Sequence, residues 1–326
     1  MPDQPTPPAL ADAPVLAHVV RGGFVESAHR ATVAVTASDG SLLHAWGAAA
    51  SPVFPRSSNK PLQSVAMLRA GLTLPPHQLA LACASHSAEP YHLDAVRDIL
   101  ANAGLTEADL QNTPDLPIDP EERDIWVAAG RTPRSLAQNC SGKHAAMLAT
   151  CQVNGWDLAA YREPGHPLQR AMAETIADLA GEPVAATAVD GCGAPVMAIS
   201  LAGLARAFGR IASAAPGTAE GTVAAAIRSC PEYLGGTRRD VTALIRGTEG
   251  VIAKDGAESV YAVGLADGRG IALKVADGGQ RARPVILAGV LRHLGVESTA
   301  YDRLEDAPVL GHGEPVGAVV AVGLAG

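Results

Sequence analysis

A serine and a lysine three residues apart, Ser57 and Lys60, are the first residues here whose types and spacing could do chemistry. Pro61 follows them, and proline is tolerated only in the first turn of a helix, so we expect a helix to begin between Ser57 and Asn59. Both side chains would share one helix face at the positive end of the helix dipole, which disfavours a second positive charge. A neutral lysine beside a serine hydroxyl is a general base with its nucleophile. The alternative is a capping serine followed by an exposed lysine.

Lysine is rare in this chain, and that rarity adds weight to the pair. Of the 25 basic residues only four are lysines, which leaves 25 − 4 = 21 arginines. The four lysines each lie in or next to a Gly-, Ser- or Cys-rich stretch: Lys60, Lys143, Lys254 and Lys274. An amine that can lose its proton is something arginine cannot supply, so the remaining lysines are candidates for that role. A codon bias with four random survivors is the alternative.

Two polar turns carry cysteines that could bind a metal. Cys140 and Lys143 are three residues apart, and Cys192 lies in a second, Gly-rich turn. The two thiols and one more ligand could hold a zinc ion that keeps an open position, with His144 as the conventional third ligand and Lys143 as the unconventional one. One alternative is a pair of buried thiols near helix termini. Another is a nucleophilic Cys140 whose pKa is lowered by the neighbouring positive charge.

Three further polar residues sit in such turns. Ser85 and His86 could act as nucleophile and base, but adjacent side chains seldom face each other, so separate roles are expected. His86 could equally be a structural hydrogen-bonding residue. Asp190 either caps its turn or receives a substrate amino group. The Gly-rich turn at Cys192 is not a phosphate-binding loop, because its spacing matches neither of the nucleotide-binding glycine motifs.

Composition narrows the class of partner. The chain has 326 residues, 3% aromatic residues, a net charge of −8 and a pI near 5.7, which argue against nucleic acid or an anionic membrane as a partner. No apolar run reaches the length of about 18 residues that a membrane-spanning helix needs. Residues 1–14 are Pro-rich and carry no basic residue, so a disordered tail is expected rather than a signal peptide. We therefore expect a cytoplasmic protein with a small-molecule substrate, whose five cysteines are thiols or metal ligands.

Strands are expected at both ends of the chain and helices between them. The period of apolar residues predicts strands over 15–25, 31–46, 184–189, 251–254, 259–265, 270–275 and 316–324. It predicts helices over 57–70, 92–103, 145–151, 167–179, 196–208, 221–230 and 283–294, and a short helix or buried strand over 78–84. The predicted fold is α/β (α+β): a central, mostly antiparallel sheet of N- and C-terminal strands, flanked by helices, with a helical middle segment. Residues 15–326 would form one catalytic domain whose polar turns converge on one cleft.

Four motifs taken together resemble a known family. They are Arg-Ser-x-x-Lys-Pro at 56–61, Cys-Ala-Ser-His-Ser at 83–87, Asn-Cys-Ser-Gly-Lys-His at 139–144 and Asp-Gly-Cys-Gly-x-Pro at 190–195. In type, order and spacing they resemble the Rhizobium-type L-asparaginases, the thermolabile, inducible class, over about residues 18 to 325. The resemblance implies hydrolysis of L-asparagine to L-aspartate and ammonia, a fold related to serine β-lactamases and glutaminases, and a homodimer.

The resemblance also implies roles for individual residues. It places two Ser–Lys pairs at Ser57–Lys60 and Ser85–Lys254, with Lys274 as the nearby alternative to Lys254. It places the zinc ligands at Cys140, Lys143 and Cys192, where the ion would tune substrate affinity. We expect the substrate to be bound by Arg56, His86, His144 and Asp190.

Two other classes of function compete with this interpretation. One is another serine amidohydrolase, a glutaminase or a penicillin-recognising enzyme; the latter usually carries Ser-Asp-Asn and Lys-Thr-Gly, and neither occurs in the sequence. The other is a non-catalytic, zinc-stabilised ligand-binding protein. It would unfold when stripped of metal, and substitution of Ser57 would have no enzymatic consequence.

Overall fold

The computed structural model describes residues 7–324, which form two compact units, each assembled from separate stretches of the chain. Within the described residues, unit 1 comprises 7–58, 198–213 and 243–324, and unit 2 comprises 59–197 and 214–242. The expectation of one catalytic domain over 15–326 stays a prediction. No helix in the described part of the chain is both long and apolar enough to cross a membrane.

Unit 1 is built on an eight-stranded antiparallel sheet with the order β10-β11-β1-β2-β9-β8-β7, and β3 pairs with β2 beside this path. Its strands are β1 (Val15–Arg21), β2 (Phe24–Thr36), β3 (Leu42–Trp46), β7 (Ile252–Gly256), β8 (Val260–Gly264), β9 (Gly270–Val275), β10 (Pro308–Gly311) and β11 (Glu314–Ala321). The two ends of the chain pair directly, with Ala17 opposite Ala321 and Thr32 opposite Lys274. The predicted fold class, a mainly antiparallel sheet of N- and C-terminal strands flanked by helices, is confirmed.

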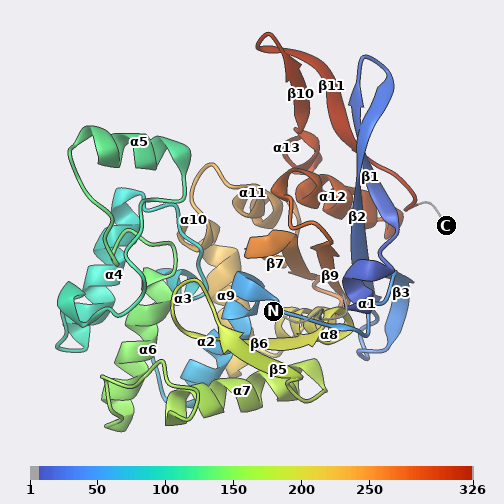
Figure 1. Ribbon diagram of the computed structural model, residues 1–326. Coiled ribbons are helices and arrows are strands. Elements are labelled where there is room, and N and C mark those ends of the chain that lie inside the picture. Colours follow the sequence, from blue (N-terminus) through green and yellow to red (C-terminus); the bar gives the residue numbers. More distant parts are fainter. Residues whose placement is uncertain (1–6, 325–326) are drawn as a thin grey trace, which may run out of the picture. The chain divides into compact units, whose positions relative to one another are not determined.

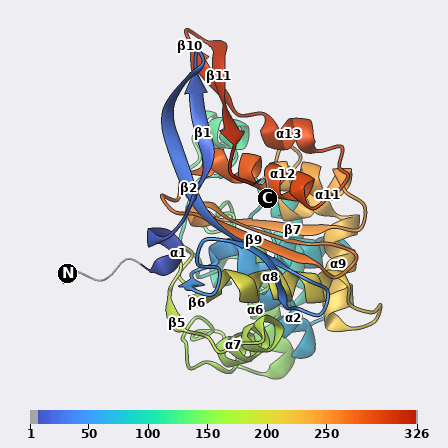
Figure 2. The same ribbon diagram turned by 90° about the vertical axis from the view of Figure 1, so that its right-hand side faces the viewer.

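Two helices cover this sheet on opposite sides, α8 (Leu201–Ala212) on one and α12 (Arg283–His293) on the other (Figures 1 and 2). Glycines let α8 lie close to the strands. A Cβ built at Gly270 would lie 1.8 Å from the Ala205 carbonyl oxygen, and one at Gly264 would lie 2.1 Å from that of Phe208. Only glycine therefore fits at these two strand positions.

Unit 1 also contains short elements and two projecting hairpins. The short elements are α1 (Pro8–Ala11), β4 (Pro52–Val53), η1 (Arg56–Asn59), η3 (Ala257–Ser259), η4 (Gln280–Ala282) and α13 (Tyr301–Glu305). The β1–β2 and β10–β11 hairpins run side by side beyond α12 and α13 (Figure 1). β4 pairs with the end of β6 (Pro195–Ser200), the strand through which the chain re-enters unit 1.

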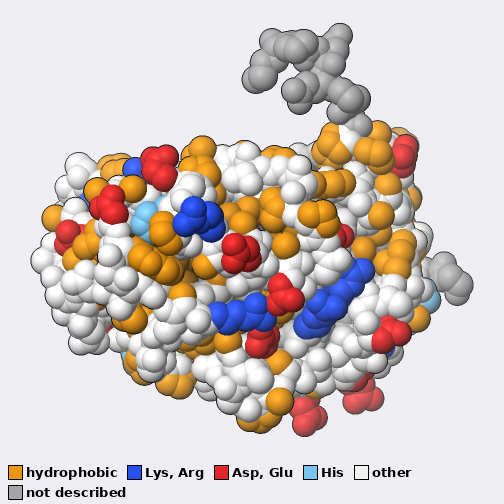
Figure 3. All heavy atoms as spheres, turned by 90° about the horizontal axis from the view of Figure 1, so that it is seen from below, with side chains coloured by type: hydrophobic (Ala, Val, Ile, Leu, Met, Phe, Trp, Pro, Cys, Tyr) orange, Lys and Arg blue, Asp and Glu red, His pale blue; other side chains and the backbone are white. Residues whose placement is uncertain are grey.

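Unit 2 is mainly helical, as the middle of the sequence predicts. Its elements are α2 (Lys60–Arg69), α3 (Pro76–Ala82), α4 (Pro90–Asn102), η2 (Glu107–Asp109), α5 (Pro120–Ala128), α6 (Ser141–Asn154), α7 (Pro167–Ala180), β5 (Ala186–Val189), α9 (Ala219–Ser229) and α10 (Pro231–Leu234). The chain leaves it through α11 (Asp240–Gly247). On the face shown in Figure 3, acidic and basic side chains lie close together among hydrophobic ones. Arginine–carboxylate pairs of this unit include Arg69–Asp178 at 2.9 Å and Arg238–Asp119 at 2.7 Å.

One predicted helix, over 196–208, is wrong in its first part. Pro195–Ser200 form strand β6, and the helix starts only at Leu201. The Ser200 hydroxyl accepts a hydrogen bond from the Gly203 N–H at 2.9 Å and so caps the helix. The cap decides the boundary, because the apolar run before it fits a buried strand as well as a helix.

The prediction of a disordered tail over 1–14 is wrong for its described part, residues 7–14. Residues 1–6 of that tail lie outside the described residues. Pro8–Ala11 form α1, and the Thr32 hydroxyl donates to the Ala9 carbonyl oxygen at 2.7 Å. Ala9 and Ala13 are fully buried, so these small side chains hold the second half of the segment in place.

Candidate active site

Lys60 lies at the centre of a buried cluster in unit 2. The helix was predicted to begin between Ser57 and Asn59; α2 itself begins at Lys60, directly after the 3-10 helix η1, and Pro61 lies in its first turn as predicted. The Lys60 side chain is fully buried, and its Nζ lies 3.2 Å from Ser85 Oγ and 3.1 Å from Cys140 Sγ. Nζ also donates to the Ala84 carbonyl oxygen. The fold therefore joins a lysine to a serine 25 residues and a cysteine 80 residues further along the chain.

The backbone around Ser85 is fixed by its neighbours. Its N–H donates to the Leu234 carbonyl oxygen at 3.0 Å, and its carbonyl oxygen accepts from Arg239 Nη1 at 3.5 Å. Because this N–H is already bonded, the group of Ser85 that remains available for a reaction is its hydroxyl and not its backbone N–H. No sequence motif pointed to Arg239, which is one of 21 arginines.

Left-handed backbone conformations concentrate near the candidate residues. Five described residues other than glycine have positive φ: Arg56 (52°), Ala88 (65°), Glu258 (56°), Ser259 (57°) and His312 (51°). Arg56 precedes Ser57, Ala88 is three residues from Ser85, and Glu258 and Ser259 form the turn after the strand of Lys254. Such conformations are costly for residues with a Cβ and gather at functional sites.

His86 is a buried, neutral residue with both ring nitrogens bonded. Nδ1 accepts from the Ala88 N–H at 3.1 Å, so Nε2 carries the proton and donates to Ser141 Oγ at 2.8 Å. Burial, together with the nearby His92 and Lys60, holds the pKa of His86 well below its usual value. The structure therefore gives His86 a hydrogen-bonding function at the start of α6, and its predicted contact with substrate stays a prediction.

The three predicted zinc ligands, Cys140, Lys143 and Cys192, come together. Lys143 Nζ lies 3.3 Å from Cys192 Sγ. A hydrogen bond from Cys140 and, despite burial, the charge of Lys143 lower the pKa of Cys192 to about 4. The same hydrogen bond, with burial, raises the pKa of Cys140 to about 12. Burial lowers the pKa of Lys143, but the charges of Cys192, Cys140 and Asp190 and the hydrogen bond to Cys192 together raise it above its usual value, so the metal-free cluster holds an ammonium beside a thiolate.

The donor chemistry of this cluster fits zinc. Among residues 7–324, no group of three or more His, Cys, Asp or Glu side chains is placed to hold a metal ion. The predicted set contains only two residues of those types, and its third member is a lysine. A thiolate, a second thiol and an amine within reach of one another are nevertheless donors that zinc accepts. Zinc binding remains a prediction.

His144 has one ring nitrogen free. Its Nδ1 lies 2.6 Å from the Tyr161 hydroxyl, and its buried Nε2 has no hydrogen-bond partner among the described residues. Burial and the neighbouring Lys143 hold the pKa of His144 well below its usual value, so the ring is neutral. The sequence did not point to Tyr161, because its 17-residue separation from His144 has no helical or strand period.

Asp190 caps its own turn. Its carboxylate accepts from the Gly191 N–H at 2.8 Å, and its carbonyl oxygen accepts from the Gly193 N–H at 2.8 Å. Gly193 has φ +86°, and a Cβ there would lie 2.6 Å from Arg162 Nη1. The turn that presents Cys192 therefore requires glycine at this position.

In unit 1, Lys254 lies against the segment that carries Ser57. Lys254 Nζ donates to the carbonyl oxygen and to Oδ1 of Asp255, each at 2.6 Å. The Ser58 hydroxyl donates to the Lys254 carbonyl oxygen at 3.2 Å. A Cβ at Gly256 would lie 2.7 Å from the Pro55 carbonyl oxygen, so the end of β7 and the 55–58 segment pack backbone to backbone.

The fold thus brings some predicted partners together and leaves others as predictions. Lys60 contacts Ser85. The motif resemblance instead paired Ser85 with Lys254. The predicted pairs Ser57–Lys60 and Ser85–Lys254 each link a residue of unit 1 with one of unit 2, and they stay predictions. Convergence of all the polar turns on one cleft also stays a prediction.

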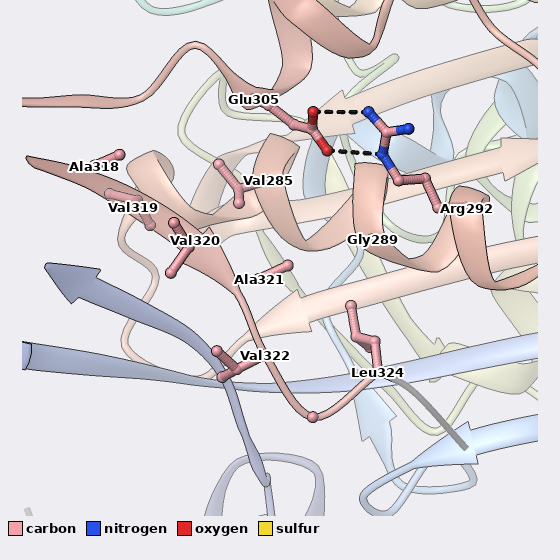
Figure 4. Close-up of a pocket in the computed structure, with 11 residues that line it drawn as sticks. Val285, Gly289, Arg292, Glu305, Ala318, Val319, Val320, Ala321, Val322 and Leu324 are labelled. Atoms are coloured by element: carbon pink, nitrogen blue, oxygen red, sulfur yellow. Dashed lines mark hydrogen bonds and ion pairs between the residues drawn. The ribbon is translucent and has the colours of Figure 1, made fainter.

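A cavity of about 520 Å³ lies elsewhere in unit 1, between α12 and β11 (Figure 4). Aliphatic side chains such as Val285, Val319 and Leu324 line it. At its rim Arg292 and Glu305 form a two-bond ion pair with distances of 3.0 and 2.9 Å. None of the predicted site residues lines this cavity.

The structure thus combines a mixed α/β fold, a mainly antiparallel sheet and a buried cluster of Lys60, Ser85 and Cys140. Residues 17–321 match the L-asparaginase II family. The chain therefore belongs to this family, which confirms the resemblance seen in the motifs. Among curated proteins, no sequence matches the chain.

Solved structures give likenesses at low identity. Native Mglu is 13% identical over 82% of this chain, with a TM-score of 0.44, and this chain spans 65% of the length of that one. A beta-lactamase from Mycobacterium bovis is 13% identical over 80% of this chain and 94% of its own, with a TM-score of 0.40. EstCE1, a hydrolase with promiscuous acyltransferase activity, is 12% identical over 79% of this chain and 92% of its own, with a TM-score of 0.40. These likenesses concern the fold alone.

Proposed function

We propose that the protein is an L-asparaginase that hydrolyses L-asparagine to L-aspartate and ammonia through a serine acyl-enzyme. The observation that carries the proposal is the 3.2 Å approach of Lys60 Nζ to Ser85 Oγ inside a buried cluster. Family membership supplies the substrate class. We also propose that it acts as a homodimer, as the motif resemblance implies, and in the cytoplasm, as the composition of the chain indicates.

Lys60 is surrounded by neutral groups. Among the described residues, its hydrogen-bond partners are the Ala84 carbonyl oxygen, the Ser85 hydroxyl and the Cys140 thiol, and none of them is a carboxylate. Lys60 Nζ donates to all three partners. In the proposed reaction the neutral form of the amine would act, and its lone pair would take the proton of the Ser85 hydroxyl.

The reaction follows from this geometry. Lys60 takes the proton of Ser85 as the serine oxygen attacks the side-chain amide carbon of asparagine. The tetrahedral intermediate collapses, and the lysine ammonium gives its proton to the departing ammonia. Water, deprotonated by the same amine, then hydrolyses the aspartyl ester and releases L-aspartate. Ser57 is the second candidate for the acylated residue, with its own hydroxyl next to the strained Arg56.

A zinc ion would be held by Cys140, Lys143 and Cys192. When bound, it would supply a positive charge that orients the α-carboxylate or amino group of the substrate and so tunes affinity. The chain's own groups nearby do the remaining positioning. His144 presents a free Nε2, and Asp190 holds the turn on which Cys192 lies.

The test is ammonia release from L-asparagine, L-glutamine and a β-lactam by the wild type, Ser85→Ala and Ser57→Ala, each with and without added zinc. We expect turnover of asparagine by the wild type and its loss in Ser85→Ala, with the variant folded by circular dichroism. If activity is lost in Ser57→Ala alone, Ser57 is the acylated residue and the proposed function still holds. A wild type that leaves asparagine untouched in every condition would refute the asparaginase proposal. Turnover of glutamine or of the β-lactam would then identify the alternative substrate.

A further inference from the structure

Arg239 lies beside Ser85, the proposed nucleophile. Its Nη1 donates to the Ser85 carbonyl oxygen at 3.5 Å, across 154 residues of sequence. That distance is long for a hydrogen bond, so the contact places the guanidinium near Ser85 without making the carbonyl a strong partner. Arg239 is half-buried, and both residues belong to unit 2, as do Lys60 and Cys140. A cation therefore lies next to the buried cluster of the candidate active site.

The segment that carries Arg239 is tied to the segment that carries Ser85. The buried Glu89 carboxylate accepts a hydrogen bond from the Thr237 N–H at 2.8 Å and another from the Thr237 hydroxyl at 2.9 Å. Gly236 has φ +128°, and a Cβ there would lie 2.7 Å from Glu89 Oε1, so only glycine allows this close approach. These contacts fix the backbone that leads to Arg239 relative to the backbone that follows Ser85.

The neighbouring Arg238 serves as an internal comparison. Its Nη2 lies 2.7 Å from Asp119 Oδ1 and 3.0 Å from Glu122 Oε1, and its Nε lies 3.2 Å from Asp119 Oδ2. Asp119 caps α5 and Glu122 lies in the first turn of that helix. The charge of Arg238 is thus used to hold α5, whereas Arg239 contacts the neutral carbonyl group of Ser85.

The proposed substrate brings an anion close to Ser85. In L-asparagine only two carbon atoms separate the amide carbon from the α-carboxylate, so the carboxylate must lie near Ser85 when the serine oxygen attacks. A carboxylate that leaves water needs a partner of opposite charge. The planar guanidinium of arginine matches a carboxylate with two parallel hydrogen bonds, which an ammonium group cannot form. The Lys143 ammonium, moreover, already lies against the sulfur of Cys192 at 3.3 Å.

We propose that Arg239 binds the α-carboxylate of the substrate and thereby selects amides that carry a carboxylate close to the reacting group. The inference rests on the proposed function, because that function supplies the substrate and places Ser85 at its amide carbon. Of the two substrate groups that a zinc ion could orient, this assignment leaves the α-amino group. Arg239 takes no part in bond breaking, so its contribution lies in binding and in the choice of substrate.

The test compares L-asparagine with two amides that each lack one of its charged groups. Succinamate lacks the α-amino group, and β-alaninamide lacks the α-carboxylate. Ammonia release gives kcat and KM for each amide with the wild type and with Arg239→Ala. In the variant, kcat/KM for asparagine and succinamate should fall about 10- to 100-fold, mainly through KM, as expected for a lost hydrogen bond to a charged group. For β-alaninamide, kcat/KM should change less than about threefold.

Further variants separate substrate binding from structure. Arg239→Lys keeps the charge without the two-pronged geometry and should recover part of the lost kcat/KM. Arg238→Ala is the matched control: it removes the ion pairs to α5, so it should lower the melting temperature and change kcat/KM for all three amides by the same factor. Thermal unfolding checks every variant, and Arg239→Gln replaces Arg239→Ala if the latter does not fold. For an amide that is hydrolysed too slowly to follow, its inhibition constant against asparagine replaces kcat/KM.

The outcomes distinguish this inference from the proposed function. An Arg239→Ala protein that loses activity equally with all three amides would overturn the inference, because Arg239 would then position Ser85 and not the substrate. An unchanged kcat/KM for asparagine would overturn it as well. Either result leaves asparagine hydrolysis by the wild type intact. A wild type that hydrolyses none of the amides would instead refute the proposed function, and the inference would fall with it.

Discussion

Lys60 and Lys254 are both fully buried lysines in serine-associated motifs, yet their partners differ. Lys60 is surrounded by a hydroxyl, a thiol and a carbonyl oxygen. Lys254 is bonded to a carboxylate at 2.6 Å. Sequence motifs treat the two lysines as equivalent, whereas in the fold one lies among neutral groups and the other lies against a carboxylate.

The largest effect should come from removing the amine at Lys60. Lys60→Met keeps an apolar chain of similar length without a base, so kcat for asparagine should fall by about 10² to 10⁴-fold. Ammonia release measured against time gives kcat, and circular dichroism confirms the fold. If kcat of the Lys60→Met protein stays within about threefold of the wild type, Lys60 takes no part in the mechanism.

Arginine substitutions separate a base from a charge. Arginine keeps the positive charge but cannot lose its proton. Lys60→Arg should therefore be about as inactive as Lys60→Met. The measurement is kcat for each variant under one set of conditions, with melting temperatures as the check on folding. A folded Lys60→Arg protein with kcat within about threefold of the wild type would mean that Lys60 is not the base.

The predicted zinc ligands Cys140, Lys143 and Cys192 are joined to Lys60 through Cys140, whose Sγ lies 3.1 Å from Lys60 Nζ. Cys192→Ala should weaken zinc binding by more than the roughly 10- to 100-fold that loss of a supporting partner costs. Titration with zinc in a competing chelator measures the affinity. Cys151→Ala removes another buried thiol, on α6, and should bind zinc as the wild type does. If the two variants bind zinc equally, the Cys140–Lys143–Cys192 set is not the metal site.

The smallest effect concerns backbone strain in the turn after the strand of Lys254. Glu258 is exposed and has φ 56°, a conformation that costs about 1–2 kcal/mol for a residue with a Cβ. Glu258→Gly removes that cost but adds unfolded-state entropy, so the free energy of unfolding should rise by about 0.5 kcal/mol. Ala257→Gly is the control, since Ala257 lacks a positive φ and its replacement should destabilise by about 0.5–1 kcal/mol. Denaturant unfolding measures both, and a fall for Glu258→Gly equal to that of the control would show that the turn is unstrained.

Local physical rules explain which parts of the fold could be predicted from the sequence. Pro61 marked the first turn of α2 because proline removes an N–H that a helix start does not need. The apolar alternation of β1, β9 and β11 predicted strands at both ends of the chain, which pair in one sheet. The boundary between β6 and α8 was missed, because the apolar run at 195–208 satisfies both periods and only the Ser200 cap separates them.

The sequence by itself determined the types of the reacting groups, their order along the chain and the family to which they belong. The tertiary structure decided which of them are partners. Ser85 and Cys140 reach Lys60 across 25 and 80 residues, distances over which sequence spacing carries no information about contact. Lys254 and Asp255 are adjacent in sequence, yet the strand period places their side chains on opposite faces, and only the folded edge strand shows the lysine turned back onto the carboxylate. Charge in a buried site is set by the groups in contact, and those contacts form only when the chain folds.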